Sequence, residues 1–284
     1  MTLDLNLDKA RAARLLVCIS YHHAPERLFY LARVLKALAG FFTARLDVVI
    51  VTNEATEALE SLCADFADST IDCEILVAGP LAHPYELTWR HKPLIPEHFL
   101  APGSPYSHFV YLEDDIQFSF ANFCYFVTYR EILRGEGLLP AFVRIEYSSA
   151  LRKHVYTDNI PTLDIRHSKT LRHEDHIFVN AWNPYNAMFV LDAELAREYV
   201  ASRSFGLESS KQVFGWETRE RAAMGLTFEQ VPDGFTARCV LPLSVKSGKP
   251  PVFSWIYHLP NNYAEDPAAG FGKLAVGELF RFGG

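Results

Sequence analysis

Residues 108–119, HFVYLEDDIQFS, place an apolar run directly before three consecutive acids. The segment FVYL is typical of a strand that is covered on both faces, as in a parallel sheet. Glu113, Asp114 and Asp115 then fall at the carboxyl end of that strand, which is where ligands bind in open α/β folds. Because three adjacent carboxylates repel one another unless a cation or a proton intervenes, this pattern indicates a divalent metal site.

Upstream of this stretch, strand-like and helix-like segments alternate along the chain. Apolar strands are predicted at 14–20, 47–52 and 73–78, and the helices between them begin near Pro25 and Asn53. A period of about 30 residues matches a βαβ unit, for which parallel pairing and a right-handed crossover are the default. The sequence therefore predicts an α/β fold with a mixed, mainly parallel sheet flanked by helices.

Several polar residues follow or lie between these strands. Neither the G-x-G-x-x-G fingerprint nor a P-loop is present, so a nucleotide is not held by either of those glycine-rich loops. Tyr21 and His22 follow the first predicted strand and are candidates for a base and ribose pocket, and Asn53, after the second strand, is assigned to the same set. Arg90 is a candidate phosphate contact within WRHK (residues 89–92), although each residue of that segment alone is more typical of a solvated helix start.

Length and composition limit the classes of function. The chain has 284 residues, which suits one large α/β domain or two small ones. It is 49% hydrophobic and 21% charged, as in ordinary soluble globular proteins. A net charge of −7 argues against general affinity for nucleic acid, because such affinity favours a basic surface.

The sequence shows no sign of export or of membrane insertion. Its first residues, MTLDLNLDK, are too acidic and too interrupted for a signal peptide. No apolar stretch approaches the roughly 20 residues that cross a bilayer. The five cysteines are widely spaced without a C-x-x-C pair, so we expect reduced core thiols. These features predict a cytoplasmic protein without a transmembrane segment and leave peripheral membrane contact open.

Residues 147–182 depart from the strand–helix pattern. This stretch is polar and long for a featureless loop, so we expect a hairpin-like or mobile segment that can cover an active site. The spacings of its four histidines match no structural zinc pattern, and a solvated loop explains them better. These histidines are His154, His167, His173 and His176.

Two features of the later sequence complete a recognisable set. Gly215, Trp216 and Glu217 lie at the start of a predicted helix that runs to Gly225. A late aromatic strand at 252–257 ends in His258. Together with the acids at 113–115, they resemble GT-A type glycosyltransferases, which take a sugar from a nucleotide-sugar donor. The acids resemble that family's D-x-D motif in an E-D-D variant, Glu217 its acceptor-side carboxylate, and His258 the C-terminal histidine that often completes its metal site. The likeness covers residues 12–262.

This resemblance implies a fold and a division of the chain. It implies a single GT-A-like, Rossmann-like domain over residues 1–284. Residues 12–117 would form the half that binds the nucleotide sugar. Residues 118–284 would form the half that binds the acceptor and would include the mobile segment.

The resemblance also implies roles for the candidate site residues. Mn²⁺ or Mg²⁺ would bind the donor diphosphate, with Asp115 and His258 as ligands and with Glu113 and Asp114 reaching the ribose or the metal's waters. Glu217 would act as the base that takes the proton of an acceptor hydroxyl, which implies inversion at the anomeric carbon. The acceptor would be a carbohydrate or a glycolipid, as in the assembly of surface polysaccharide or lipopolysaccharide.

Other interpretations remain open at this point. The chain can instead be a metal-dependent nucleotidyl or phosphoryl enzyme, or a domain that binds nucleotide sugars without turnover. The acids at 113–115 can be a helix-capping cluster, and Glu217 can be an ordinary acid in a first helical turn. His258 can be a histidine that is simply hydrogen-bonded within the fold.

Overall fold

The computed structural model describes two compact units. Residues Leu7–Phe120 and Ala187–Leu226 form the first, here called the parallel-sheet unit. The second, here called the mixed-sheet unit, comprises Met1–Asn6, Ala121–Asn186 and Thr227–Gly284. The structure describes the whole chain except residues 1–4, 69, 159–161, 214 and 282–284.

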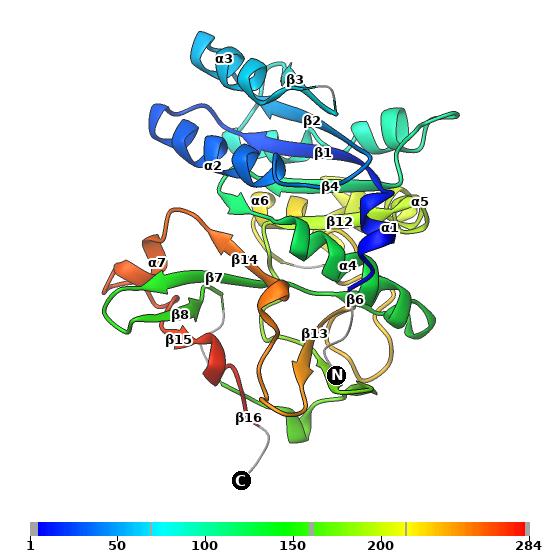
Figure 1. Cartoon of the computed structure of the whole chain (residues 1–284), viewed down its shortest axis with the longest axis vertical. Coiled ribbons are helices and arrows are strands. Elements are labelled where there is room, and N and C mark those ends of the chain that lie inside the picture. Colours follow the sequence, from blue (N-terminus) through cyan, green and yellow to red (C-terminus); the bar gives the residue numbers. More distant parts are fainter. Residues whose placement is uncertain (1–4, 69, 159–161, 214, 282–284) are drawn as a thin grey trace. The chain divides into compact units, whose positions relative to one another are not determined.

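The parallel-sheet unit is built on a five-stranded sheet in the order β12-β4-β1-β2-β3 (Figure 1). Seven of the eight residues of β1 and of β2 are buried, as expected for strands covered on both faces. The strands β1 to β4 are parallel, and only β12 runs antiparallel to its neighbour β4. The mainly parallel sheet predicted from the sequence is therefore confirmed. The strands are β1 (Arg14–Tyr21), β2 (Arg45–Thr52), β3 (Ile71–Val77), β4 (His108–Glu113) and β12 (Met188–Asp192).

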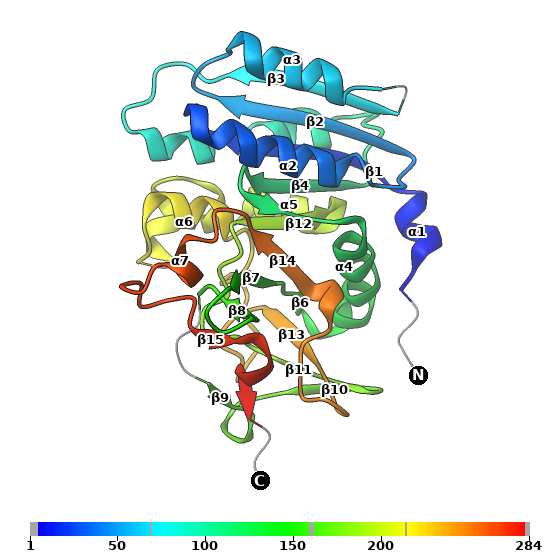
Figure 2. The same cartoon turned by 60° about the vertical axis from the view of Figure 1, so that its left-hand side comes forward.

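Helices flank this sheet, with α2 and α3 running alongside the strands (Figure 2). The buried residues of α2 recur at helical spacing, so one face of that helix packs inward. The side chain of Thr56 caps α3 by accepting from the amide of Leu59 at 3.3 Å, and Asp192 caps α5 by accepting from Leu195 at 2.8 Å. The helices of the unit are α1 (Leu7–Arg11), α2 (Leu28–Leu38), α3 (Glu57–Phe66), α5 (Ala193–Ala201) and α6 (Thr218–Ala223), with shorter turns η1 (Pro25–Arg27), η2 (Pro84–Trp89) and η3 (Ile95–Phe99).

The mixed-sheet unit contains shorter strands and a core of its own. The strands β15, β8, β7 and β14 lie side by side in that order, and β7 and β14 are parallel. A second sheet has the order β10-β11-β13-β6, and β16 pairs with β9. Buried side chains of these sheets, such as Ile145, Tyr156 and Leu243, form one hydrophobic cluster.

The elements of the mixed-sheet unit also answer one expectation for residues 147–182. Strands β10 and β11 form an antiparallel hairpin, so the hairpin-like alternative is confirmed, while mobility of the segment stays a prediction. The strands are β6 (Leu139–Pro140), β7 (Val143–Ser148), β8 (Lys153–Tyr156), β9 (Leu163–Asp164), β10 (Leu171–His173), β11 (His176–Val179), β13 (Cys239–Ser244), β14 (Trp255–His258), β15 (Leu274–Ala275) and β16 (Phe280–Arg281). The helices are α4 (Phe120–Leu133) and α7 (Asn262–Glu265).

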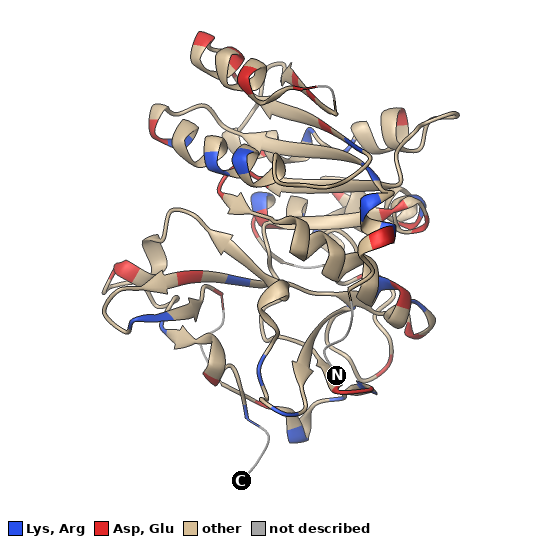
Figure 3. Ribbon diagram, viewed as in Figure 1, with Lys and Arg blue, Asp and Glu red and all other residues tan. Residues whose placement is uncertain are grey.

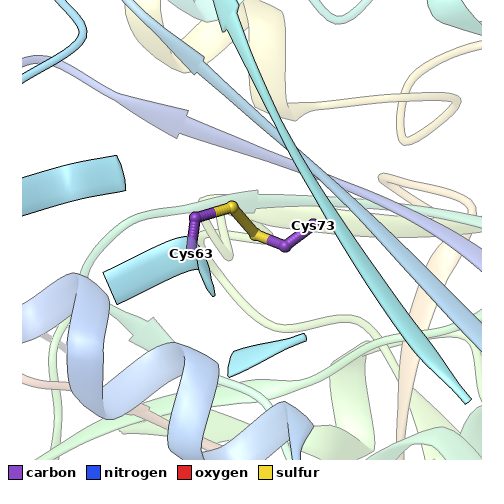
Figure 4. The surroundings of a disulfide bond; sticks show 2 residues. All are labelled: Cys63 and Cys73. Carbon is purple, nitrogen blue, oxygen red and sulfur yellow. A yellow bond between two sulfur atoms is a disulfide. The ribbon is translucent and has the colours of Figure 1, made fainter. Parts of the chain in front are cut away.

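A disulfide joins Cys63 of α3 to Cys73 of β3 (Figure 4). The Cα atoms of the two residues lie 5.6 Å apart, within the usual range for such a bond. The expectation that all cysteines are reduced is therefore wrong for this pair. The cause is tertiary packing, because Cys63 lies on the inner face of a helix that packs on β3. The cysteines accordingly no longer support the cytoplasmic location that was inferred from them.

The helices of the structure can be tested for the length and apolarity that a transmembrane segment needs. Among the described residues, no helix is both long and apolar enough to cross a membrane. This finding agrees with the absence of a transmembrane segment expected from the sequence.

Candidate functional site

The three consecutive acids lie at the carboxyl end of β4 in the parallel-sheet unit. All six residues of β4 are buried, and Glu113, Asp114 and Asp115 remain only 9%, 3% and 6% exposed. The amide of Glu113 donates to the carbonyl of Ala187 at 3.1 Å, which ties the end of β4 to the segment entering β12. The local sequence therefore places a carboxylate cluster at the edge of the sheet where ligands bind in such folds.

Arg27, at the end of η1, contacts two of these acids. Its Nε lies 2.8 Å from Oδ2 of Asp114, and its Nη2 contacts Oδ1 of the same carboxylate. The same Nη2 lies 3.0 Å from Oδ2 of Asp115. Such a fork is the geometry in which a guanidinium binds a carboxylate most firmly. Arg27 was missed in the sequence, although its position after the first βα turn placed it at the same edge of the sheet.

The electrostatics of the cluster favour the protonated form of one acid. Burial is the main cause that raises the pKa of Asp114 to about 7. The charges of Asp115 and Glu113 add to this rise, whereas the Arg27 guanidinium opposes it. A raised carboxyl pKa that arises from burial and from neighbouring like charges is typical of functional sites.

Polar residues after β1 and β2 lie at the same edge of the sheet. Asn53 accepts a hydrogen bond from the backbone amide of His23 at 2.7 Å, so its side chain joins the two strand ends. The hydroxyl of Tyr21 lies 3.3 Å from Nδ1 of His23, and the pKa of Tyr21 is raised by burial and then by the charge of Asp114. His22 is exposed to solvent. The predicted residues of the base and ribose pocket therefore share one edge, with Asn53 already engaged in holding the backbone.

Arg90 lines a separate hollow. A cavity of about 420 Å³ lies along β2 and β3, and Arg90 is among its lining residues, whereas none of the three acids is. Arg90 itself is exposed, and its Nη2 lies 3.4 Å from the carbonyl of Pro80. This cavity therefore does not join Arg90 to the carboxylates, and a phosphate contact by Arg90 stays a prediction.

The other two cations of the WRHK segment are not solvated, contrary to the simplest expectation. His91 is 1% exposed and Lys92 is 5% exposed. The Nζ of Lys92 contacts the hydroxyl of Tyr199 and lies 4.6 Å from the ring of Trp89 and 4.2 Å from that of Tyr199. Burial lowers the pKa of Lys92, and burial with the neighbouring Lys92 charge lowers the pKa of His91. Both side chains are packed among aromatic rings inside the parallel-sheet unit, His91 against Tyr111 and Lys92 against Tyr199.

Glu217 lies where α6 begins. It is the residue that precedes the helix, its side chain makes no capping hydrogen bond, and it is exposed. The indole nitrogen of Trp89 donates to the carbonyl of Thr218 at 2.8 Å, which fixes the start of α6 against η2. An exposed carboxylate on a fixed helix start is able to meet an incoming hydroxyl, and the expected role as a base stays a prediction.

His258 belongs to the mixed-sheet unit, where it ends β14. Its Nδ1 lies 2.5 Å from Oε1 of Glu146 on β7, and the two side chains are 7% and 0% exposed. Basic and acidic residues follow one another along β7 (Figure 3). The basic one, Arg144, contacts Asp158, with its Nε 2.8 Å from Oδ2. The contact of His258 with Glu146 was not expected from the sequence, and a role of His258 as a metal ligand stays a prediction.

The chemistry of the acids fits a hard divalent cation. Glu113, Asp114 and Asp115 supply carboxylate oxygens, and with Arg27 the four side chains carry a formal net charge of −2. Among the residues that the structure describes, no group of three or more His, Cys, Asp or Glu is arranged to hold a metal ion. Mg²⁺ is usually bound by one or two carboxylates together with water and substrate phosphates. Carboxylate oxygens suit such a cation, and a metal at this site stays a prediction.

No protein-family model matches the chain, and no curated protein matches it.

Proposed function

We propose that this protein is a GT-A type glycosyltransferase that moves a sugar from a nucleotide-diphosphate sugar to an acceptor hydroxyl. One observation supports this most directly: three buried carboxylates lie at the carboxyl end of β4 in a mainly parallel sheet. In open α/β folds this edge receives the ligand, and carboxylate oxygens suit Mg²⁺ or Mn²⁺. The acceptor is a carbohydrate or a glycolipid, and assembly of surface polysaccharide or lipopolysaccharide is the process we favour.

The residues of the site have distinct roles in this proposal. A divalent metal, when bound, would supply Lewis-acid chemistry at the donor diphosphate. Asp115 would hold the metal, and Glu113 or Asp114 would reach the ribose or the metal's waters, while the assignment of His258 as a metal ligand rests on the resemblance alone. Arg27 fixes the carboxylate of Asp114 in one orientation through its two-point contact. Glu217 takes the proton of the acceptor hydroxyl, whose oxygen then attacks the anomeric carbon with inversion.

A thermal-shift screen tests the proposal. Nucleotide sugars and free nucleoside diphosphates are added to the protein with and without Mn²⁺. A ligand at about 100 times its Kd stabilises the native state by about 2.7 kcal/mol, which for a chain of this size raises Tm by roughly 5 °C or more. We expect such a rise with Mn²⁺ and a nucleoside diphosphate, and we expect Asp115→Ala to abolish it.

Two controls make the screen specific. Asp65→Ala removes an exposed acid of α3 and should leave the shift unchanged. If nucleoside triphosphates raise Tm and nucleoside diphosphates do not, the result favours the alternative, a metal-dependent nucleotidyl or phosphoryl enzyme. If a nucleotide-diphosphate sugar raises Tm but is not turned over, the protein is a domain that binds nucleotide sugars without catalysis. If no nucleotide changes Tm in any metal, the proposal is wrong.

A further inference from the structure

A second cavity, of about 390 Å³, lies within the mixed-sheet unit. Its volume falls in the range that is typical of sites for small molecules. The side chains that face it come from β8, from the turn after β13, from β14 and from the turn η9 (Val276–Glu278). The polar and aromatic residues among them are Lys153, His154, Lys249, Trp255 and Glu278.

Two lysines converge on η9 at this cavity. The Nζ of Lys153 lies 3.5 Å from Oε1 of Glu278. A Cβ at Gly277 would lie 3.1 Å from Cε and 3.3 Å from Nζ of Lys249, so that side chain lies directly against the glycine. Two lysines and one glutamate give the lining a formal net charge of +1, in a chain whose net charge is −7. This local excess of positive charge favours an anionic ligand.

Both lysines are carried by hydrogen-bonded backbone. Lys153 pairs with Ser148 across β8 and β7. The turn that leads to Lys249 is closed by two hydrogen bonds, in which the amide of Ser244 donates to the carbonyl of Lys249 at 3.1 Å and the amide of Gly248 donates to the carbonyl of Ser244 at 2.7 Å. Val276, which also lines the cavity, belongs to the buried cluster of the unit. The cavity is therefore a pre-formed part of the fold, as binding sites usually are.

Aromatic rings continue from the cavity across one face of three adjacent strands. His154 and Tyr147 are cross-strand partners on β8 and β7. Tyr257 of β14 pairs with Ile145, two residues before Tyr147, so all these side chains share one face. The ring of His154 lies 5.5 Å from those of Tyr147 and Trp255 and 5.7 Å from that of Tyr257. Because Tyr147 and Tyr257 are 46% and 37% exposed, part of this aromatic surface is open to a ligand.

We propose that this cavity and the adjoining rings bind an acidic carbohydrate, with a sugar ring against the aromatic side chains and its carboxylate or phosphate against Lys153 and Lys249. The face of an aromatic ring is electron-rich and attracts the weakly positive C–H groups of a pyranose. Ammonium groups form charge-assisted hydrogen bonds with carboxylate and phosphate oxygens. The inference rests on the proposed function in one respect, namely that this carbohydrate is part of the acceptor.

Single-stranded nucleic acid also combines stacking rings with anionic groups. Its binding depends on basic residues that follow the phosphate backbone, whereas this cavity offers two lysines in a chain of net charge −7. The observations therefore favour a carbohydrate, and an oligonucleotide serves as the competing ligand in the test.

Isothermal titration calorimetry of the full chain at low ionic strength measures the binding. The ligands are an oligomer of galacturonic acid, a neutral maltose-type oligomer of equal length, glucose-6-phosphate, inorganic phosphate and an oligothymidylate. No donor and no divalent metal are added, so the result does not depend on the carboxylates of β4.

Three variants locate the binding. Lys153→Gln combined with Lys249→Gln removes both ammonium groups, and Tyr257→Ala removes an exposed ring. Lys246→Gln is the matched control, because Lys246 is an exposed lysine of the same turn that does not line the cavity. Since the lysine side chains are exposed, the lysine variants should keep the Tm of the wild type.

We expect an acidic sugar to bind at least about tenfold more tightly than the neutral oligomer, and the double lysine variant to lose at least about tenfold while Lys246→Gln loses nothing. Tyr257→Ala should weaken the acidic oligomer about threefold to tenfold without changing the affinity for inorganic phosphate. Whichever of galacturonate and glucose-6-phosphate binds more tightly identifies the anionic group.

Four results would overturn the inference. They are an absence of binding by both acidic sugars, an unchanged affinity in the double lysine variant, inorganic phosphate binding as tightly as the acidic sugars, and tighter binding of the oligothymidylate. Failure of the proposed function is seen separately, as an absence of donor turnover. In that case the acidic carbohydrate still binds, and only its assignment as the acceptor is wrong.

Discussion

Arg27 forms a two-point contact with Asp114, in which Nε lies 2.8 Å from Oδ2 and Nη2 contacts Oδ1. This contact connects the helix start after β1 to the acids after β4, two segments 87 residues apart in the chain. Arg27 is about one-third exposed, whereas Asp114 is almost fully buried. The guanidinium therefore compensates a carboxylate that solvent cannot reach.

Replacement of Arg27 should destabilise the fold and loosen the acids. Arg27→Ala leaves buried carboxylate oxygens without these donors, a loss that typically costs about 1–3 kcal/mol. Partial exposure of Arg27 places the expected value toward the lower end of that range. Urea unfolding at pH 7.5 measures the change. Arg33→Ala, which removes an exposed arginine lying over the ring of Phe29 in α2, should cost less than about 0.5 kcal/mol. Equal losses in the two variants would contradict this account.

His108, the first residue of β4, should lower stability in acid, whereas the raised pKa of Asp114 acts in the opposite direction over the same pH range. Burial lowers the pKa of His108 from 6.5 to about 4. Between these values the unfolded chain binds a proton that the native state excludes, so unfolding becomes easier as pH falls from about 6.5 to 4. The shift in the pKa of His108 corresponds to about 3 kcal/mol in the free energy of unfolding. This contribution is present in full above pH 6.5 and is lost as pH falls toward 4.

The measurement is the urea-unfolding free energy at pH 7.5 and at pH 5. His108→Gln should raise the unfolding free energy at pH 5 relative to that at pH 7.5, while His22→Gln, which changes an exposed histidine, should leave the wild-type difference unchanged. If His108→Gln leaves the difference between the two pH values at its wild-type value, the effect assigned to His108 is wrong.

Reduction should lower the stability of the parallel-sheet unit. The disulfide Cys63–Cys73 closes a loop with a sequence separation of 10 residues. In the chain-entropy model, a loop of this size contributes about 2–3 kcal/mol. We expect dithiothreitol to lower Tm of the wild type but not of the Cys63→Ser, Cys73→Ser double variant. Mass spectrometry after alkylation of the unreduced, denatured protein should find three free thiols, and five alkylated cysteines would disprove the bond.

Kinetic measurements can distinguish the catalytic role proposed for Glu217 from that of its neighbour Glu220. Glu217→Gln should retain metal-dependent donor binding but lower sugar transfer by about 10²- to 10⁴-fold, because a general base contributes that much. Glu220→Gln is the matched control, since Glu220 lies on α6 and contacts Arg219 at 3.5 Å. Unchanged transfer in Glu217→Gln would remove it as the base, and loss in Glu220→Gln alone would move the role one turn along the helix.

Local periodicity made much of the parallel-sheet unit predictable from the sequence. The run at 14–20 predicted β1, which spans Arg14–Tyr21, and the run before the acids predicted β4. Buried parallel strands appear as continuous apolar segments, and their carboxyl ends share an edge. The acids of the candidate site could therefore be assigned to that edge from the order of residues alone.

The partners of the site residues could not be predicted in the same way. Arg27 and Glu146 act on residues 87 and 112 positions away, and nothing in local sequence identifies such pairs. The pairing of Cys63 with Cys73 depends on how α3 packs on β3, and the burial of Lys92 depends on the rings of Trp89 and Tyr199. Local pattern predicts elements, whereas these contacts are decided by tertiary packing.

The most direct test of the central claim is donor turnover by the unmodified protein. Wild-type protein is incubated with Mn²⁺ and a panel of UDP- and GDP-sugars, and released nucleoside diphosphate is measured with and without chelator. We predict release from at least one donor, its loss in EDTA, and a large reduction in Asp115→Ala but not in Asp65→Ala. Two results would contradict the assignment of this site to a metal-dependent glycosyltransferase. One is that Asp115→Ala releases as much nucleoside diphosphate as the wild type, and the other is that no donor releases any.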